Sequence, residues 1–315
     1  MEIRAINTCY ELESWQAPDG SYHYASLPDH LQGSDFGPRL KSYILYQYHQ
    51  CHVTQPLLLE QLWELEVSIS SGQLSNILTE GHEDFHHEKQ GLLDQAKQDS
   101  DYLQTDDTGA RHQGKTGYCT FIGNKWLSFF KSTGSKSRID FLEILNGESG
   151  YCFNDYAFKY MIEQRLAPKY IKIIEQVKGQ SYESTKDFHA SLERLSVRQK
   201  YAIKTITEAA LLGHLIEQGM SEEMILLSDD AGQFNILVHA LCWVHVERNL
   251  QKIHTYNNQQ RKELDQVLDL FWALYQQLKS YKEHPDKNKK DKIVESFEAI
   301  YNWKTECLPA AFRQG

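Results

Sequence analysis

Leucine and isoleucine recur at helical spacing through the segment 38–80. Proline is favoured in the first turn of a helix, so Pro38 and Pro56 mark two helix starts. A short break follows the second run, and either Ser70 or Ser71 is placed to cap a further helix. The segment therefore predicts a helix-turn-helix arrangement, which is typical both of DNA-reading modules and of ordinary packed helical hairpins.

Beyond residue 100 the pattern changes to short apolar runs separated by glycine and other turn formers. Strands are expected at 101–106, 117–123, 125–131, 150–155 and 224–229. Helices are expected at 80–100, at 137–145, through most of 156–222 and from 246 onward, with a strand or a strand–helix junction at 239–245. This order predicts an α/β chain whose mixed sheet is flanked by helices, and it is compatible with an RNase H-like core.

The same pattern divides the chain into three parts. Residues 1–100 are expected to form an N-terminal helical region that holds the helix-turn-helix-like segment. Residues 101–250 are expected to form the RNase H-like core, with a helical insertion at about 156–223. Residues 251–315 are expected to form a region of long C-terminal helices that is incomplete.

The composition is typical of a folded cytoplasmic protein. Of the 315 residues 41% are hydrophobic, which is enough for a sizeable core, and no apolar run is long enough to span a membrane. The first residues carry acidic side chains and lack the pattern of a signal peptide. The six cysteines are dispersed, with no C-x-x-C pair, so we expect free thiols in a reducing compartment.

The formal net charge of −10 weighs mildly against DNA binding, because contacts to phosphate need lysine and arginine. Charge can still be segregated on one face of a protein, and a metal site built from carboxylates is itself acidic. Basic stretches lie at 131–138 and 282–292. The second of these is more typical of a solvated loop.

Two segments run from an apolar strand directly into paired carboxylates. The first holds Asp106 and Asp107, and the second holds Asp229 and Asp230. Acids at the ends of neighbouring strands can bind hard divalent cations, and metal ions held in this way catalyse phosphoryl transfer. The alternative is ordinary turn chemistry, because Asp-Asp is followed in each case by a small residue and glycine.

Cys242 and His245 have the spacing of half a zinc site. No matching second pair lies nearby in the sequence, so a structural zinc ion is the weaker interpretation.

Two blocks of the chain resemble a known family. The sequence TDDTGARHQGK at 105–115 resembles the block around the first catalytic aspartate of insertion-sequence transposases of the metal-dependent carboxylate (DDE) type, of the insertion-sequence-66-like family. The sequence ILLSDDAGQFN at 225–235, followed by HALCWVHVERNL at 239–250, resembles the block with the second catalytic aspartate and its trailing C-W-x-H-x-x-R signature. The resemblance covers roughly residues 33–280.

The resemblance implies that Asp106 is the first catalytic acid and Asp229 the second, with both binding Mg²⁺ or Mn²⁺. Asp155 is the rival for the second position, because it follows an expected strand directly after the first helix of the core. A transposase of this kind cleaves DNA at the terminal inverted repeats of its element, and the freed 3′-hydroxyl attacks target DNA. Such enzymes act as homo-oligomers and have no membrane partner.

Three basic residues are candidate phosphate contacts on charge alone. They are Lys115, Lys136 and Arg138.

The chain departs from the family pattern at the third acid, a glutamate on a late helix in a block resembling N-x-x-E-x-x-x-R. No such block is evident, and the candidates Glu295, Glu298 and Glu306 lack its flanking residues. Glu247 lies within the C-W-x-H-x-x-R signature, at a position that the signature leaves variable. We therefore expect a C-terminally truncated or inactive copy. Two alternatives stay open: a DNA-binding remnant without catalysis, and an RNase H-like metal-dependent nuclease without strand transfer.

Overall fold

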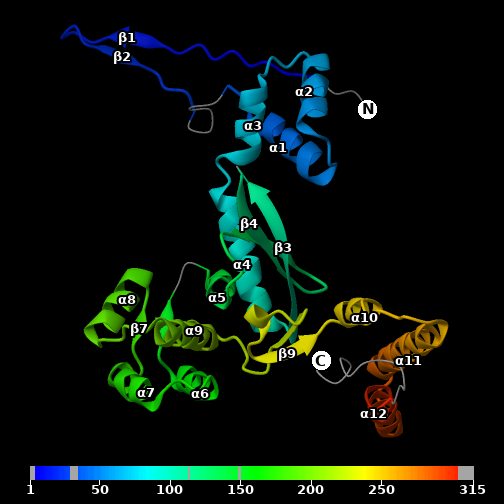
Figure 1. Cartoon of the computed structure of the whole chain (residues 1–315). Helices are drawn as coiled ribbons and strands as arrows, with labels where there is room; N and C mark the ends of the chain where they lie inside the picture. The colour runs from blue at the N-terminus through cyan, green and yellow to red at the C-terminus, as the bar shows by residue number, and fades with distance from the viewer. Residues whose placement is uncertain (1–3, 29–34, 113, 148–149, 304–315) are drawn as a thin grey trace. The chain divides into compact units, whose positions relative to one another are not determined.

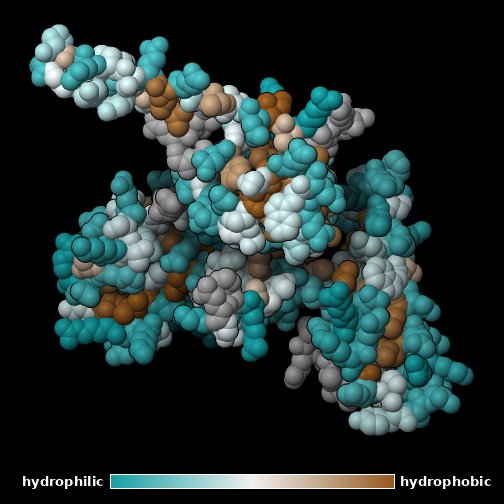
Figure 2. All heavy atoms as spheres, turned by 90° about the horizontal axis from the view of Figure 1, so that it is seen from above, coloured by the Kyte–Doolittle hydropathy of each residue, from teal (hydrophilic) through white to brown (hydrophobic). Residues whose placement is uncertain are grey.

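The computed structural model describes residues 4–28, 35–112, 114–147 and 150–303 (Figure 1). The chain divides into two compact units, Met1–Lys89 and Gln90–Gly315, and each is described by itself. No helix in the described ranges combines the length and the apolar character that a membrane span requires. Hydrophilic side chains cover most of the face seen in Figure 2, with hydrophobic groups in separate patches between them.

Short helices build the first unit around a small apolar core. Its elements are the hairpin β1 (Ser14–Gln16) and β2 (Tyr22–Tyr24), followed by α1 (Pro38–Leu45), the π-helical turn η2 (Tyr46–Gln50), α2 (Gln55–Glu64) and α3 (Ser71–Thr79). Ile44, Leu58 and Leu74 are among the buried residues that join the three α-helices. Ser70 caps α3, because its hydroxyl accepts from Gln73 N while the Gln73 side chain accepts from Ser70 N. The helices expected in this segment are therefore confirmed.

A five-stranded mixed sheet organises the second unit. Its strands are β3 (Tyr102–His112), β4 (Lys115–Gly123), β5 (Ser128–Thr133), β8 (Ile225–Ser228) and β9 (Val238–Leu241). Their order across the sheet is β5-β4-β3-β8-β9. The first three strands form an antiparallel meander, whereas β8 and β9 pair in parallel with β3 and with each other. The expected α/β class with a mixed sheet flanked by helices is confirmed.

One hydrophobic core joins this sheet to most of the helices of the unit. They are α4 (Glu83–Asp99) from residue 90 onward, α5 (Arg138–Asn146), α6 (Asp155–Glu163), α7 (Pro168–Ile174), the 3₁₀ turn η3 (Glu175–Val177), α8 (Thr185–Arg194) and α9 (Lys200–Glu217). The helix α9 is the most buried of them and packs against both α5 and α6. The helices between residues 156 and 223 thus share the core of the sheet rather than forming a separate body.

The remaining helices follow β9 and pack mainly on one another. They are α10 (Trp243–Gln251), α11 (Asn258–Glu283) and α12 (Lys287–Tyr301). Val267, Leu274 and Ile300 form their buried cluster, with Trp243 packed against it. The indole of Trp243 contacts the ring of Phe271 at a centroid distance of 4.2 Å, which ties the start of α10 to α11.

Two expected strands differ from those observed. The strand expected at 101–106 continues to His112, because residues 107–112 pair with the start of β4. Asp106 therefore lies inside β3 rather than at its end. The strand expected at 150–155 is only β6 (Tyr151–Cys152), which pairs with β7 (Ser181–Tyr182) in a separate two-stranded sheet.

Candidate metal centre

The parallel pairing of β3 with β8 brings Asp106 and Asp229 together. The register of β3 with β8 ends at the pair Gln104 and Leu227, so two further residues along each chain segment place Asp106 opposite Asp229. Parallel strands run in the same direction, and both acids therefore lie at the same end of the pairing. Asp229 follows the last residue of β8 directly.

Side-chain alternation places both acids on the same face of the sheet. Leu103 and Thr105 of β3 are buried, as are Leu226 and Ser228 of β8. The residues that alternate with these buried ones, Asp106 and Asp229 among them, point to the opposite face, because side chains alternate along a strand. Asp106 and Asp229 thus share the face that the main core does not cover, where Asp106 is exposed and Asp229 half-buried.

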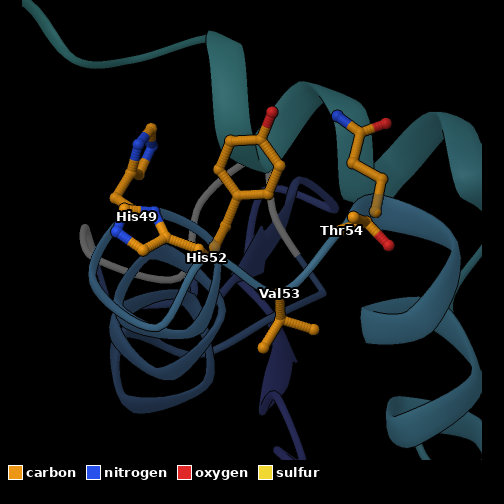
Figure 3. A pocket seen from close by; sticks show the side chains of 6 residues that line it. His49, His52, Val53 and Thr54 are labelled. Carbon is orange, nitrogen blue, oxygen red and sulfur yellow. The ribbon is translucent and has the colours of Figure 1, made fainter.

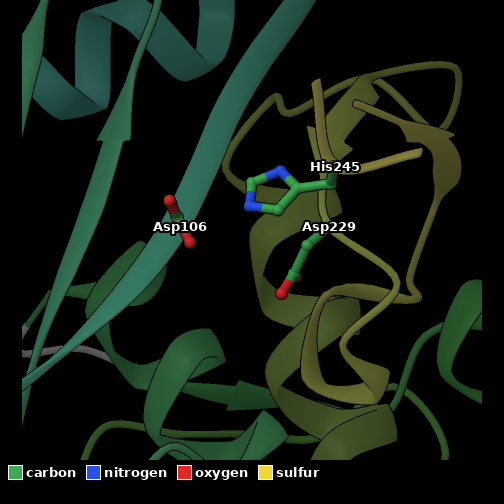
Figure 4. Close-up of side chains that lie close together, drawn as sticks. All are labelled: Asp106, Asp229 and His245. Carbon is green, nitrogen blue, oxygen red and sulfur yellow. The ribbon is translucent and has the colours of Figure 1, made fainter. Parts of the chain in front are cut away.

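The helix α10 adds a histidine to this pair. Cys242 precedes α10, and its backbone N–H donates to Ser228 O at 2.7 Å, which fixes the start of the helix beside the end of β8. His245 lies in the first turn. One ligand atom from each of Asp106, Asp229 and His245 lies within 4.8 Å of the other two. Figure 4 shows a ring nitrogen of His245 facing the two carboxylates.

No cation of the described protein neutralises this site. Asp106 accepts a hydrogen bond from Asp107 N at 2.9 Å, and Asp229 accepts one from Ala231 N at 3.1 Å. Neither carboxylate forms an ion pair with lysine or arginine anywhere in the described ranges. The Nδ1 atom of His245 is buried without a hydrogen-bond partner. Two like charges beside the other ring nitrogen, Nε2, fit a divalent cation, because carboxylate oxygen and imidazole nitrogen are both common metal ligands.

The neighbouring acid Asp107 has a different environment from Asp106. Its side chain lies on the other face of β3 and accepts hydrogen bonds from Thr120 Oγ1 at 2.5 Å and from Gln233 Nε2 at 2.8 Å. Gln233 belongs to the 3₁₀ turn η4 (Gly232–Phe234), which follows Asp229. Asp107 therefore ties β3 to the loop of Asp229, and its oxygens already have protein donors.

The other acids considered for the site lie elsewhere. Asp155 starts α6, where its exposed carboxylate pairs with Lys178 at 2.7 Å. Glu247 accepts from Trp272 Nε1 at 3.0 Å. Glu295 and Glu298 lie on α12, and Glu306 lies outside the described residues. Across the described ranges no glutamate joins the cluster of Asp106, Asp229 and His245.

The three basic candidates are also dispersed. Lys115 is exposed at the start of β4, and the Lys136 ammonium lies 5.6 Å from the ring centre of Tyr118. Arg138 has several protein partners: it donates to Tyr160 Oη at 2.8 Å, to Glu208 Oε2 at 3.4 Å and to the carbonyl of Gly232. Its guanidinium thus connects α5 to α6, to α9 and to η4.

The partners of Arg138 form a buried polar network. The Glu208 side chain is only 4% exposed, and Tyr160 donates to its Oε2 at 2.8 Å. Burial raises the pKa of Tyr160, with the Glu208 charge acting in the same direction, so that the phenol stays protonated as a donor. Since Gly232 follows Asp229 by three residues, this network holds the loop that carries the second acid.

A second group of histidines lies in the first unit. His49 and His52 line a pocket at the junction of η2 and α2, together with Tyr48, Val53, Thr54 and Gln55 (Figure 3). No aspartate, glutamate or cysteine lines this pocket, and these histidines belong to no cluster of potential metal ligands among the described residues.

Sequence reasoning identified both aspartates but assigned His245 only to the C-x-x-H motif. The position of His245 in the fold could have assigned it to the site. The parallel pairing of β9 with β8 brings the start of α10, and with it His245, next to the end of β8. That pairing was not among the expectations drawn from the sequence.

Comparison with known proteins adds a relative without a described function. The chain is 33% identical over 207 residues to the uncharacterized protein y4jO of Sinorhizobium fredii (strain NBRC 101917 / NGR234). The match covers 65% of this chain and 64% of the relative, which is less than two thirds of the relative's length. The sequence matches no family model, and no solved structure matches the chain.

Proposed function

We propose that the second unit is the RNase H-like catalytic core of an insertion-sequence transposase, of the insertion-sequence-66-like family. The observation that carries the proposal is the convergence of Asp106 and Asp229 from two neighbouring parallel strands, with ligand atoms within 4.8 Å. The sequence blocks around these two acids are the ones that resemble the family. A meander of three strands, a helix and further parallel strands also has the order expected of this core.

The two carboxylates are the groups that would hold a divalent ion, Mg²⁺ or Mn²⁺. When bound, such an ion supplies a Lewis acid that activates the attacking hydroxyl and offsets charge on the leaving oxygen. Hydrogen bonds within the chain set the orientation of these carboxylates. The backbone N–H groups of Asp107 and Ala231 orient them, and Asp107 and Arg138 hold the loop after β8. Exposure of Asp106 leaves the site open to a large substrate such as DNA.

The test is metal-dependent cleavage by the full chain. A DNA duplex that carries the terminal repeats of the element is incubated with Mg²⁺ or Mn²⁺, and nicked and joined products are separated by size. Nicking by the wild type supports a catalytic core that is active without the third acid of the family pattern. A loss of that nicking by about a thousandfold in Asp106→Asn and Asp229→Asn then supports the site, because a metal contributes several kcal/mol to the reaction and each tenfold in rate is about 1.4 kcal/mol. Asp155→Asn is the matched control, since it removes the rival acid outside the cluster.

Three outcomes separate the candidate functions. Nicking followed by joined products supports a transposase, and nicking without joining supports a nuclease of the same chemistry. Salt-dependent DNA binding without any metal-dependent cleavage supports a DNA-binding remnant. Nicking that survives in Asp106→Asn and Asp229→Asn, or that is lost in Asp155→Asn alone, overturns the assignment of the site.

A further inference from the structure

We propose that His245 is a third ligand of the same ion, and that its imidazole makes the site favour Mn²⁺ over Mg²⁺. The inference concerns the metal site of the proposed function, but it rests on the side chains themselves. His245 reaches the site from α10, whereas Asp106 and Asp229 come from the sheet. Three ligands from β3, the end of β8 and α10 would surround an ion from different directions.

Packing does not account for the position of this imidazole. Buried ring nitrogens are normally hydrogen-bonded, yet Nδ1 of His245 has no partner in the described chain, so no hydrogen bond from that atom holds the ring in place. The ring nitrogen that faces the carboxylates is the other one, Nε2. The side chain takes part in none of the aromatic contacts found for its neighbour Trp243, which packs on Phe271 and Tyr275. Trp243 therefore serves the apolar contact of α10 with α11, while His245 faces the carboxylates (Figure 4).

Ion pairing does not account for it either. An imidazolium that paired with Asp106 or Asp229 would lie within 4.0 Å of a carboxylate oxygen, and no such pair occurs among the described residues. The three ligand atoms nevertheless all lie within 4.8 Å. Ligand atoms around one ion with bonds of about 2.1 Å are about 3–4 Å apart. Small side-chain rotations therefore suffice to bring all three onto one ion.

The imidazole determines which ion is preferred. Mg²⁺ selects oxygen ligands in an octahedral arrangement and keeps several waters, whereas an imidazole nitrogen is a better ligand for transition metals. A site of two carboxylates and one imidazole thus gains more from Mn²⁺ than a site of carboxylates alone. Removal of His245 is expected to lower the affinity for Mn²⁺ by about tenfold or more and to change the affinity for Mg²⁺ by less than about threefold.

The experiment measures binding to the full chain with MnCl₂ and MgCl₂ as the probes, without DNA. Affinities come from isothermal titration calorimetry, and pulsed electron paramagnetic resonance of bound Mn²⁺ detects the hyperfine coupling of a ligating nitrogen. The variants are His245→Ala and the matched control His254→Ala, which removes an exposed histidine beyond α10. We expect nitrogen coupling in the wild type and in His254→Ala, and its loss together with the drop in Mn²⁺ affinity in His245→Ala.

Nitrogen coupling that persists in His245→Ala, or unchanged Mn²⁺ affinity in that variant, overturns the inference. If His245→Ala does not fold, the wild type alone decides, because bound Mn²⁺ without nitrogen coupling also overturns it. The outcome is distinct from that of the proposed function. If the protein binds Mn²⁺ through a nitrogen but cleaves no DNA, the inference on His245 is supported and the proposed function is contradicted. If the protein cleaves DNA but bound Mn²⁺ shows no nitrogen coupling, the proposed function is supported and the inference is contradicted.

Discussion

Asp106→Asn is expected to stabilise the metal-free protein and to weaken its stabilisation by a divalent ion. The asparagine keeps the oxygen that accepts from Asp107 N. It removes the negative charge that lies within 4.8 Å of the Asp229 carboxylate. No lysine or arginine in the described chain compensates this repulsion by an ion pair. Neutralising one partner therefore relieves the folded state of an unfavourable charge pair.

The magnitude follows from the separation of the two carboxylates. Carboxylate oxygens of the two residues lie within 4.8 Å of each other. At that upper limit two unit charges repel by about 0.9 kcal/mol in bulk water and by about 3.5 kcal/mol at an effective dielectric constant of about 20. Asp106 is exposed, so solvent screening favours the lower value. We expect a gain of about 1 kcal/mol, which corresponds to a Tm increase of about 2–4 °C for a unit of this size.

The assay is thermal unfolding of both proteins at low ionic strength, first with EDTA and then with increasing Mn²⁺. Ion binding stabilises the wild type by about 2.7 kcal/mol at a hundredfold excess over Kd. The variant lacks one ligand and gains less, so the order of the two Tm values reverses with added metal. Asp107→Ala is the control from the adjacent position. It is expected to lower the Tm in EDTA, because Thr120 and Gln233 lose a shared acceptor at a cost of about 1–3 kcal/mol.

A lower Tm of Asp106→Asn in EDTA would refute the repulsion between the two aspartates. An equal rise in Tm of both proteins with Mn²⁺ would refute their sharing of one ion.

Three further substitutions test the packing of the second unit. Arg138→Met is expected to lower the free energy of unfolding by about 3 kcal/mol in urea titrations, because the buried Glu208 loses its guanidinium partner and keeps only the Tyr160 hydroxyl and the more distant Lys204 ammonium. Adding Glu208→Gln is expected to restore part of the loss, and an additive loss would contradict the pairing of Arg138 with Glu208. Burial and the Lys97 charge lower the pKa of His214, so the unfolded chain binds this proton more readily than the folded chain, and stability is expected to fall as the pH drops below about 6.5. The substitution His214→Gln is expected to flatten this pH dependence, and an unchanged pH profile of stability would exclude His214 as its cause. Gly213→Ala places a Cβ 2.3 Å from the Cys152 carbonyl oxygen, so we expect a loss of about 1–3 kcal/mol by urea unfolding, and a neutral effect would mean that the helix moves freely there.

The helices were predictable because their signals are local. Pro38 and Pro56 lie in the first turns of α1 and α2, and Ser70 forms a capping box. The basic stretch 282–292 shows the limit of such reasoning. Its charge favours a solvated loop, but Asp286 caps a helix that starts at Lys287, and the apolar residues further along α12 pack on α11. The burial of those later residues stabilises α12 as a helix, and the charged residues at 282–292 alone do not predict it.

The strands were less predictable because their partners are distant in sequence. Asp107, Gly109 and Ala110 have weak strand preference, and the pairing of residues 107–112 with β4 holds them in β3. Tyr151 and Cys152 have a good apolar pattern but pair with Ser181 and Tyr182 instead of joining the main sheet. Neither outcome can be read from the segment itself, since the hydrogen-bonding partner decides it.

The candidate site depends on the register of one strand pair. Asp106 and Asp229 were identified from their local context, but their approach requires Gln104 to lie opposite Leu227. A shift of β8 by one residue would turn Asp229 toward the main core, because side chains alternate between the two faces. The burial of Leu226 and Ser228 opposes that shift. Hydrophobic packing on one face of the sheet thus places the two carboxylates on the other, and the same register fixes Cys242, the start of α10 and His245 beside them.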